Sequence, residues 1–134
     1  MDKSKNTKTV PESLVASVSV SAFLTGKAKQ DFIKWYDKNY ISVERFLKDY
    51  DPEQLFKSLH EPFKPTLIVE WLDSIGMFID CGYYAKGKMC SGIESEKFSF
   101  ISTGTKHETR REAIISAIKK ANELYNAKVV EAEH

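Results

Sequence analysis

The sequence predicts an α+β fold: a helical N-terminal part of three to four short helices, then an antiparallel sheet of two to three strands packed on a C-terminal helix. The helices are predicted because apolar residues recur every three to four positions between residues 27 and 75 and again between 109 and 126. The sheet is predicted because residues 77–84 are rich in aromatic and branched side chains, and because Phe98 and Phe100 alternate with Ser99 and Ile101 over 97–102.

Length and composition are those of one small globular domain. The chain has 134 residues, of which 42% are hydrophobic, with 20 basic and 19 acidic side chains. A core of this size needs neither a metal nor disulfide bonds, and the sequence implies no cofactor. We expect one domain over 27–128, a disordered tail or short strand over 1–26, and a frayed tail over 129–134.

Two helices are predicted in the first third of the chain. The first begins at Lys27 and ends near Asn39, and its apolar side chains are Phe32, Ile33, Trp35, Tyr36 and Tyr40. A short second helix is expected over 42–50, where the apolar stripe continues. Before them, serines alternate with apolar residues over 18–22, a pattern that fits either a short strand or a flexible linker.

Two further helices follow. The segment 51–53, Asp-Pro-Glu, is a helix start, because a capping carboxylate, a proline at the first helical position and an acid near the positive end of the dipole all favour initiation. Residues 67–75 then carry apolar side chains at helical spacing, and a strand there would leave large aliphatic side chains outside. Gly76 is placed to end this helix.

Two strands are predicted after Gly76, over Met77–Tyr84 and Lys97–Ser102, and we expect them to pair with each other as an antiparallel ribbon. The connection over 85–96 is too long for a tight turn. It is either a mobile loop, and then a candidate contact surface, or it contains one further short strand.

The C-terminal helix is predicted over about 109–126. Thr105 with Glu108 and Thr109 with Glu112 both have the spacing of a capping box. The apolar stripe that follows is continuous and consists of Ile114, Ala117, Ile118, Ala121, Leu124 and Tyr125.

Cysteine usage and hydropathy bear on the compartment. Cys81 and Cys90 are too few for a disulfide framework, and we expect both to be reduced thiols. No stretch reaches the roughly 20 apolar residues that span a bilayer. Pro11 and Glu12 interrupt the N-terminal segment where a secretory signal would be apolar. The sequence therefore predicts a cytoplasmic protein with no membrane partner.

Basic residues near the C-terminal helix are one lead to function. Arg110 and Arg111 fall in its first turn, where free backbone N–H groups and basic side chains together can meet phosphates. The full candidate set for a nucleic-acid site is Lys86, Lys88, Arg110, Arg111, Lys119 and Lys120. The competing interpretation, which we favour, is a packing helix with a solvated basic edge.

The stretch from Thr109 to Leu124 resembles the final helix of double-stranded-RNA-binding domains, which also follows three strands. The chain departs from that family because a first helix with minor-groove contact residues is not recognisable, and arginines stand where the family has lysines. The resemblance implies a duplex RNA partner.

Three carboxylates are a second lead. Glu70 and Asp73 lie one helical turn apart, and Asp80 follows in the first predicted strand, so they are candidates for the site of a metal-dependent hydrolase. Neither paired lysines at the spacing found in nucleases, nor a second histidine, nor a glycine-rich phosphate loop accompanies them. We therefore favour solvated acids and predict neither catalytic residues nor metal ligands, so that the protein is not an enzyme.

Aromatic residues crowd the helical half, where residues 31–80 carry ten acidic and six basic side chains. Short acidic helices cannot bury every ring, which favours a protein-binding patch. Its candidate residues are Trp35, Tyr36, Tyr40 and Tyr50. The expected partner is an unidentified protein. The sequence leaves open whether the protein forms a homodimer.

Three segments carry a wider resemblance: DFIKWYDKNY from residue 31, VEWLDSIG over 69–76 and RREAIISAIKKANELYN over 110–126. Over roughly residues 28–128, the chain resembles small uncharacterised proteins of phages and mobile elements in gut anaerobic bacteria. This resemblance implies an α+β fold in the cytoplasm of a bacterial host cell, but no activity or site residue. The sequence thus favours a non-enzymatic interaction protein, as a phage accessory protein acting on a host protein.

Overall fold

The structure is a computed structural model that describes residues 18–41, 51–85 and 87–133. The expected N-terminal tail up to residue 17, the helix expected over 42–50 with Tyr50, and Lys86 lie outside this part of the chain. The elements in chain order are a 3-10 helix Val20–Ala22, α3 Gly26–Tyr36, a π-helical segment Asp37–Ile41, α4 Pro52–Lys57, α5 Phe63–Ser74, β1 Phe78–Ala85, β2 Lys88–Ser95, β3 Phe98–Ser102 and α6 Arg110–Glu133.

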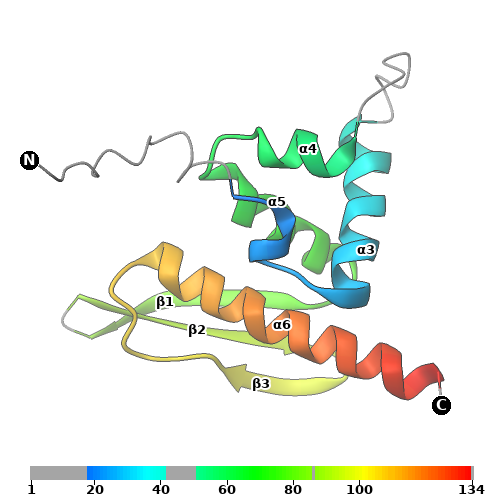
Figure 1. Ribbon diagram of the computed structural model, residues 1–134. Coiled ribbons are helices and arrows are strands. Elements are labelled where there is room, and N and C mark those ends of the chain that lie inside the picture. Colours follow the sequence, from blue (N-terminus) through cyan, green and yellow to red (C-terminus); the bar gives the residue numbers. More distant parts are fainter. Residues whose placement is uncertain (1–17, 42–50, 86, 134) are drawn as a thin grey trace, which may run out of the picture.

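The predicted α+β class is confirmed. Helix α6 lies across one face of the three-stranded sheet, and α3, α4 and α5 form a helical layer on the same side (Figure 1). Helix α6 contacts β1 and β2 as well as α3 and α5, and α5 also contacts β1. Among the described residues, no helix combines the length and the apolarity needed to cross a membrane.

The sheet has the order β1-β2-β3, with both neighbouring pairs antiparallel. The expected pairing of the first and last strands with each other is wrong, because β2 lies between them. The segment over 85–96 is therefore not a mobile loop but holds the central strand. The short connection between β1 and β2 contains Gly87, whose φ of 79° is a backbone conformation that glycine adopts without strain.

The sequence pattern concealed β2 because its centre is small and polar. Ser91 is only 2% exposed, yet its hydroxyl forms a hydrogen bond of 2.6 Å with the hydroxyl of Thr103. Gly92 follows, and Ile93 is fully buried. The centre of β2 therefore contacts its neighbours with a serine hydroxyl and a glycine. It lacks the run of branched and aromatic side chains from which a strand is usually predicted.

The core is centred on Phe32 of α3, which is fully buried. Its ring meets Phe56 at a centroid distance of 5.5 Å and Trp71 at 5.9 Å, both edge-on, and also contacts Trp35 and Tyr36. Edge-to-face rings add to the stabilisation that burial alone provides. This cluster joins α3, α4 and α5.

The segment from Val18 to Ala22 is neither a strand nor a linker. It contains the 3-10 helix, and the next two residues continue the turn. Val20, Phe23 and Leu24 are buried because their spacing of three and four places them on one side. The packed part of the chain therefore begins before residue 27.

Two of the three expected capping signals start a helix, and the third does not. The Asp51 carboxylate accepts from the N–H of Glu53 at 3.1 Å, as predicted. The Thr109 hydroxyl accepts from the N–H of Glu112 at 3.0 Å, so the second of the two expected boxes starts α6. The first does not, because residue 107 pairs with β2 instead. Helix α6 continues to Glu133, beyond its expected end at 126.

A buried lysine joins three segments of the helical layer. The Lys64 ammonium is fully buried and donates to the carbonyl oxygens of Val18 at 2.7 Å and Lys57 at 2.9 Å, and to the Glu61 carboxylate at 2.5 Å. It also lies 5.8 Å from the centre of the Phe56 ring. A buried charge is tolerated only when it is paired and hydrogen-bonded in this way.

The N-terminus of α3 is capped by side chains from the other end of the chain. Thr25, at the capping position, makes no side-chain cap of its own. Instead Asn126 accepts from the N–H of Ala28 at 2.8 Å and donates to the Thr25 carbonyl at 2.9 Å, while Asn122 accepts from the N–H of Thr25 at 2.9 Å. These bonds attach the N-terminus of α3 to α6.

Replacing Lys64 by methionine should lower the free energy of unfolding by about 3 kcal/mol, because two carbonyls and a carboxylate lose their buried donor. Urea denaturation followed by circular dichroism measures the loss. The control is Lys57→Met, which removes an exposed ammonium from α4 and leaves the backbone carbonyl in place. Equal effects of the two substitutions would contradict the structural role of Lys64.

Replacing Asn126 by alanine should cost about 1–2 kcal/mol, because the α3 N-terminus loses one capping acceptor and one donor. Asn126→Asp, which keeps the acceptor, should cost less. The matched control on α6 is Glu123→Ala, whose exposed ion pair with Lys120 spans 3.5 Å and contributes little. If alanine at 126 costs no more than alanine at 123 in the same denaturation experiment, the capping account is wrong.

Candidate functional site

One face of the sheet is left open. Residues that lie opposite each other on neighbouring strands point to the same face of the sheet. Asp80, Gly92 and Ser102 are opposite each other, so all three belong to the open face. All helices in contact with the sheet pack on the other face, where Ile93 is buried. The open face carries Phe78 of β1 and Phe100 of β3, which are 47% and 52% exposed.

Phe100 is held on this face by a glycine. A Cβ atom built on Gly92 would lie 2.1 Å from the Phe100 ring and 2.9 Å from the Ile101 carbonyl oxygen, so only glycine fits beneath the ring. The ring covers the backbone of β2 and still exposes half of its surface. An aromatic ring in this position is ordered before any partner arrives, which lowers the entropic cost of binding.

The open face is acidic as well as aromatic. Glu94 lies opposite Phe78, and Asp80 lies opposite Gly92, so two carboxylates flank the rings. At the far end of β1, Tyr83 and Tyr84 are also strongly exposed, where the pairing with β2 is irregular. Such a surface complements apolar groups that are accompanied by positive charge.

The residues predicted for protein binding lie together, but not on this face. Tyr40 is 44% exposed and its ring contacts those of Trp35 and Tyr36, while Tyr36 is buried and Trp35 is half-buried. A pocket of about 440 Å³ beside them is lined by Tyr36, Tyr40, Leu59, Phe63, Thr66, Leu67 and Glu70. Of the three described residues, only Tyr40 offers much surface.

The Tyr40 hydroxyl donates to the Glu70 carboxylate. This hydrogen bond, together with some burial and the negative charge, raises the pKa of Tyr40 above its ordinary value. Two of the polar side chains in the pocket wall, Tyr40 and Glu70, are thereby engaged with each other.

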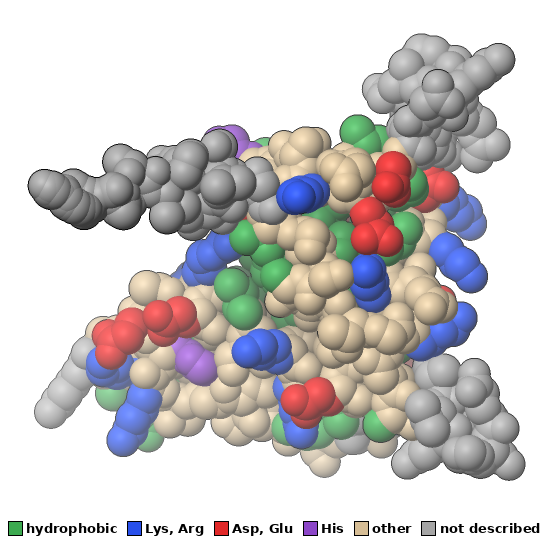
Figure 2. Space-filling model, in the orientation of Figure 1, with side chains coloured by type: hydrophobic (Ala, Val, Ile, Leu, Met, Phe, Trp, Pro, Cys, Tyr) green, Lys and Arg blue, Asp and Glu red, His purple; other side chains and the backbone are tan. Residues whose placement is uncertain are grey.

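The basic residues predicted for nucleic-acid binding are partly neutralised. Lys88 pairs with Glu108, Arg111 lies 3.8 Å from Glu61, and Lys120 lies 3.5 Å from Glu123. Arg110 is exposed and its guanidinium lies 3.9 Å from the Cys81 sulfur, and Lys119 is exposed on α6. Acidic and basic side chains are scattered over the face that carries α6, without a continuous basic stripe (Figure 2).

The three carboxylates predicted as a possible metal site are not brought together. Glu70 bonds Tyr40, and Asp73 is on α5, where burial and the neighbouring Glu70 charge raise the pKa of its carboxyl. Asp80 lies on the open face of the sheet, the face opposite to the helices. In the described part of the chain, no group of three or more histidine, cysteine, aspartate or glutamate side chains could hold a metal ion.

A serine and a histidine meet beneath the start of α6. His107 Nε2 lies 3.0 Å from the Thr103 carbonyl oxygen and 3.4 Å from Ser91 Oγ. A carbonyl only accepts, so Nε2 carries the proton and is not a base for the serine hydroxyl. Ser116 also donates to the Thr103 carbonyl, at 2.9 Å. This part-buried network links β2, the loop before α6 and α6 itself.

The two cysteines are free thiols. Cys81 lies opposite Ser91 and Cys90 lies opposite Gly82, so the two side chains project from opposite faces of the sheet. A disulfide between them is therefore excluded in this register. Burial raises the pKa of the Cys81 thiol, and the Arg110 guanidinium opposes this effect only in part.

Comparisons of the chain with protein-family models, with curated proteins and with solved structures gave no match. The sequence did not reveal Phe78 and Phe100 as surface residues, because Phe78 stands between Met77 and Ile79, and Phe100 is followed by Ile101. Alternation shows that a strand has two faces but not which one the helices cover.

Tyr125 provides a test of how α6 docks on the helical layer. Its hydroxyl donates to the Asp31 carboxylate, and burial together with this bond raises the pKa of Tyr125 from 10.0 to about 12. A pKa raised on folding stabilises the protein fully below the unfolded value. This contribution is therefore lost as the pH rises from 10 to 12.

The free energy of unfolding should therefore fall more steeply between pH 10 and 12 in the wild type than in Tyr125→Phe. Absorbance at 295 nm, which follows phenolate formation, should lose part of its latest rise in this variant. Tyr83→Phe, which removes a hydroxyl from an exposed tyrosine, is the control and should keep that rise. An unchanged late rise in Tyr125→Phe would show that another tyrosine is responsible.

Proposed function

We propose that this protein is a non-enzymatic binding protein whose open sheet face docks on a partner protein. The observation that supports the proposal is the pair of half-exposed rings, Phe78 and Phe100, on a sheet face that no described helix covers. Partly exposed aromatic rings that are already ordered are the usual anchors of protein interfaces. The partner would add a third layer to the fold.

Charge indicates what kind of partner fits. Asp80 and Glu94 share the face with the rings. Two copies of this face brought together would oppose like charges, which is unfavourable once water is removed. A different protein that presents apolar groups with lysine or arginine beside them is therefore the better partner, and we do not propose a homodimer.

The setting follows from the earlier resemblance. Likeness to proteins of phages and mobile elements makes a protein of the bacterial host the partner to test first, in the cytoplasm. Two free thiols are in keeping with that compartment. The aromatic cluster at Tyr40 is a less suitable anchor, because its most accessible hydroxyl is already bonded to Glu70.

Affinity capture from a lysate of the host bacterium should retain a protein on the wild type that is lost from two variants of the open face. The first variant, Phe78→Thr/Phe100→Thr, removes the two rings. The second, Asp80→Lys/Glu94→Lys, reverses the two charges and leaves the rings in place. The control, Asp73→Lys/Glu123→Lys, makes the same change in net charge elsewhere. Melting temperatures establish that each variant is folded.

Three outcomes would overturn the proposal. The first is a captured protein that both variants of the open face retain. The second is a dimer in sedimentation velocity that the phenylalanine substitutions dissociate, because the partner would then be a second copy. The third is salt-sensitive binding of duplex RNA in a fluorescence-anisotropy titration that Arg110→Glu/Arg111→Glu abolishes, because phosphate contacts at α6 would then be the function.

A further inference from the structure

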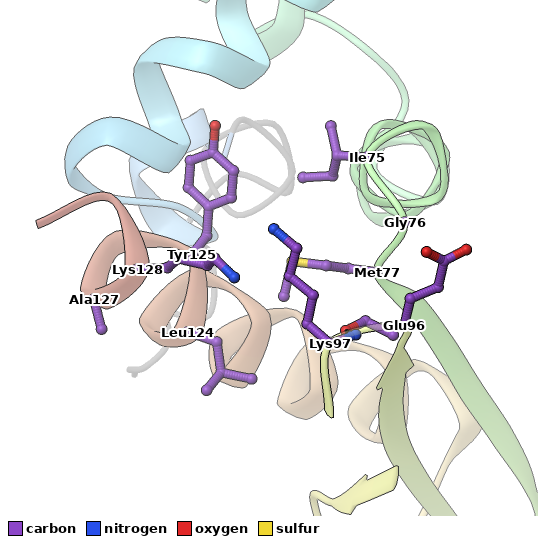
Figure 3. A pocket seen from close by; sticks show the side chains of 10 residues that line it. Ile75, Gly76, Met77, Glu96, Lys97, Leu124, Tyr125, Ala127 and Lys128 are labelled. Carbon is purple, nitrogen blue, oxygen red and sulfur yellow. Dashed lines mark hydrogen bonds between the residues drawn. The ribbon is translucent and has the colours of Figure 1, made fainter. Parts of the chain in front are cut away.

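A pocket of about 390 Å³ opens at the end of the sheet away from the β1–β2 turn. It lies between the end of α5, the β2–β3 turn and the last turns of α6 (Figure 3). Its lining residues are Ile75, Gly76, Met77, Ser95, Glu96, Lys97, Leu124, Tyr125, Ala127 and Lys128. The volume is within the range of small-molecule sites, which is about 300–1,000 Å³.

The pocket wall is mainly apolar. Met77 is buried at its base, while Ile75, which follows α5 at the C-cap position, is 40% exposed. The Tyr125 hydroxyl is bonded to Asp31, so the tyrosine offers its ring to the pocket. An exposed isoleucine beside a buried methionine and a tyrosine ring is a surface that an apolar ligand would cover.

The polar group at the centre is a cation. The Lys97 side chain extends over Met77 into the pocket, whereas the Glu96 carboxylate points away from it (Figure 3). Lys97 forms no ion pair with any residue that the structure describes. Lys128 adds a second ammonium group to the lining. Positive charge above an apolar floor complements an anionic head on an apolar chain.

We propose that this pocket binds an amphiphilic monocarboxylate, with the carboxylate on Lys97 and the chain on Ile75, Met77 and the Tyr125 ring. This site is separate from the open sheet face, and the proposal does not depend on the proposed function. Fatty-acid-like molecules of medium chain length and aromatic carboxylates share this chemistry. A phosphate or a nucleotide would lack the apolar chain that the floor requires.

The test uses sodium octanoate and sodium decanoate as probes and follows the methyl NMR signals of the full-length protein. The Met77 methyl should shift on titration, while Met89, at the opposite end of β2, is the internal control. Decanoate should bind more tightly than octanoate, by roughly fourfold for each added methylene. Octylammonium chloride, with the same chain and the opposite charge, should leave Met77 unchanged.

Two variants assign the site. Lys97→Glu should weaken octanoate binding by about tenfold or more, because a charged hydrogen-bond partner is lost, whereas Lys106→Glu, at an exposed lysine outside the pocket, should not. Ala127→Trp should block binding without changing any charge, since residue 127 is exposed on α6 and lines the pocket. The absence of a Met77 shift, equal binding of octanoate and octylammonium, or equal effects of the two lysine variants would overturn the proposal.

Discussion

The docking of helix α6 joins the two layers of the molecule, because α6 contacts β1 and β2 of the sheet and α3 and α5 of the helical layer. Its buried residues include Ala113, Ala117 and Ala121, whose small side chains let the backbones approach closely. Further along, Asn122 and Asn126 supply the capping groups that the N-terminus of α3 lacks. The same helix therefore packs on the sheet and holds the N-terminus of α3 in place.

The open sheet face is a consequence of this arrangement. Because α6 and α5 lie on the same side of the strands, no described helix remains to cover the other side (Figure 1). Gly92 then allows the Phe100 ring to lie against the backbone, and Phe78 stands beside acidic neighbours. The proposed docking of a partner protein rests on this combination of half-exposed rings and carboxylates on one sheet face.

Some of the candidate site could be predicted and some could not. Trp35, Tyr36 and Tyr40 lie together because helical spacing places them on neighbouring turns, and this could be inferred from the sequence. The exposed fraction of these rings could not be inferred from the sequence, because the rings of α3 pack mostly into the core. The partners of basic residues were equally hidden, because an ion pair such as Arg111 with Glu61 joins residues far apart in the chain.

The sequence by itself determined the fold class, the helices α3, α4, α5 and α6, and local start and stop signals such as Asp51, Thr109 and Gly76. These depend on interactions within a few residues, which a pattern contains in full. Only the tertiary structure decided the place of β2, the burial of Lys64 and the capping of α3 by Asn126. Each of these is stabilised by groups from distant segments, and a polar residue shows its long-range partner only when the fold brings the two together.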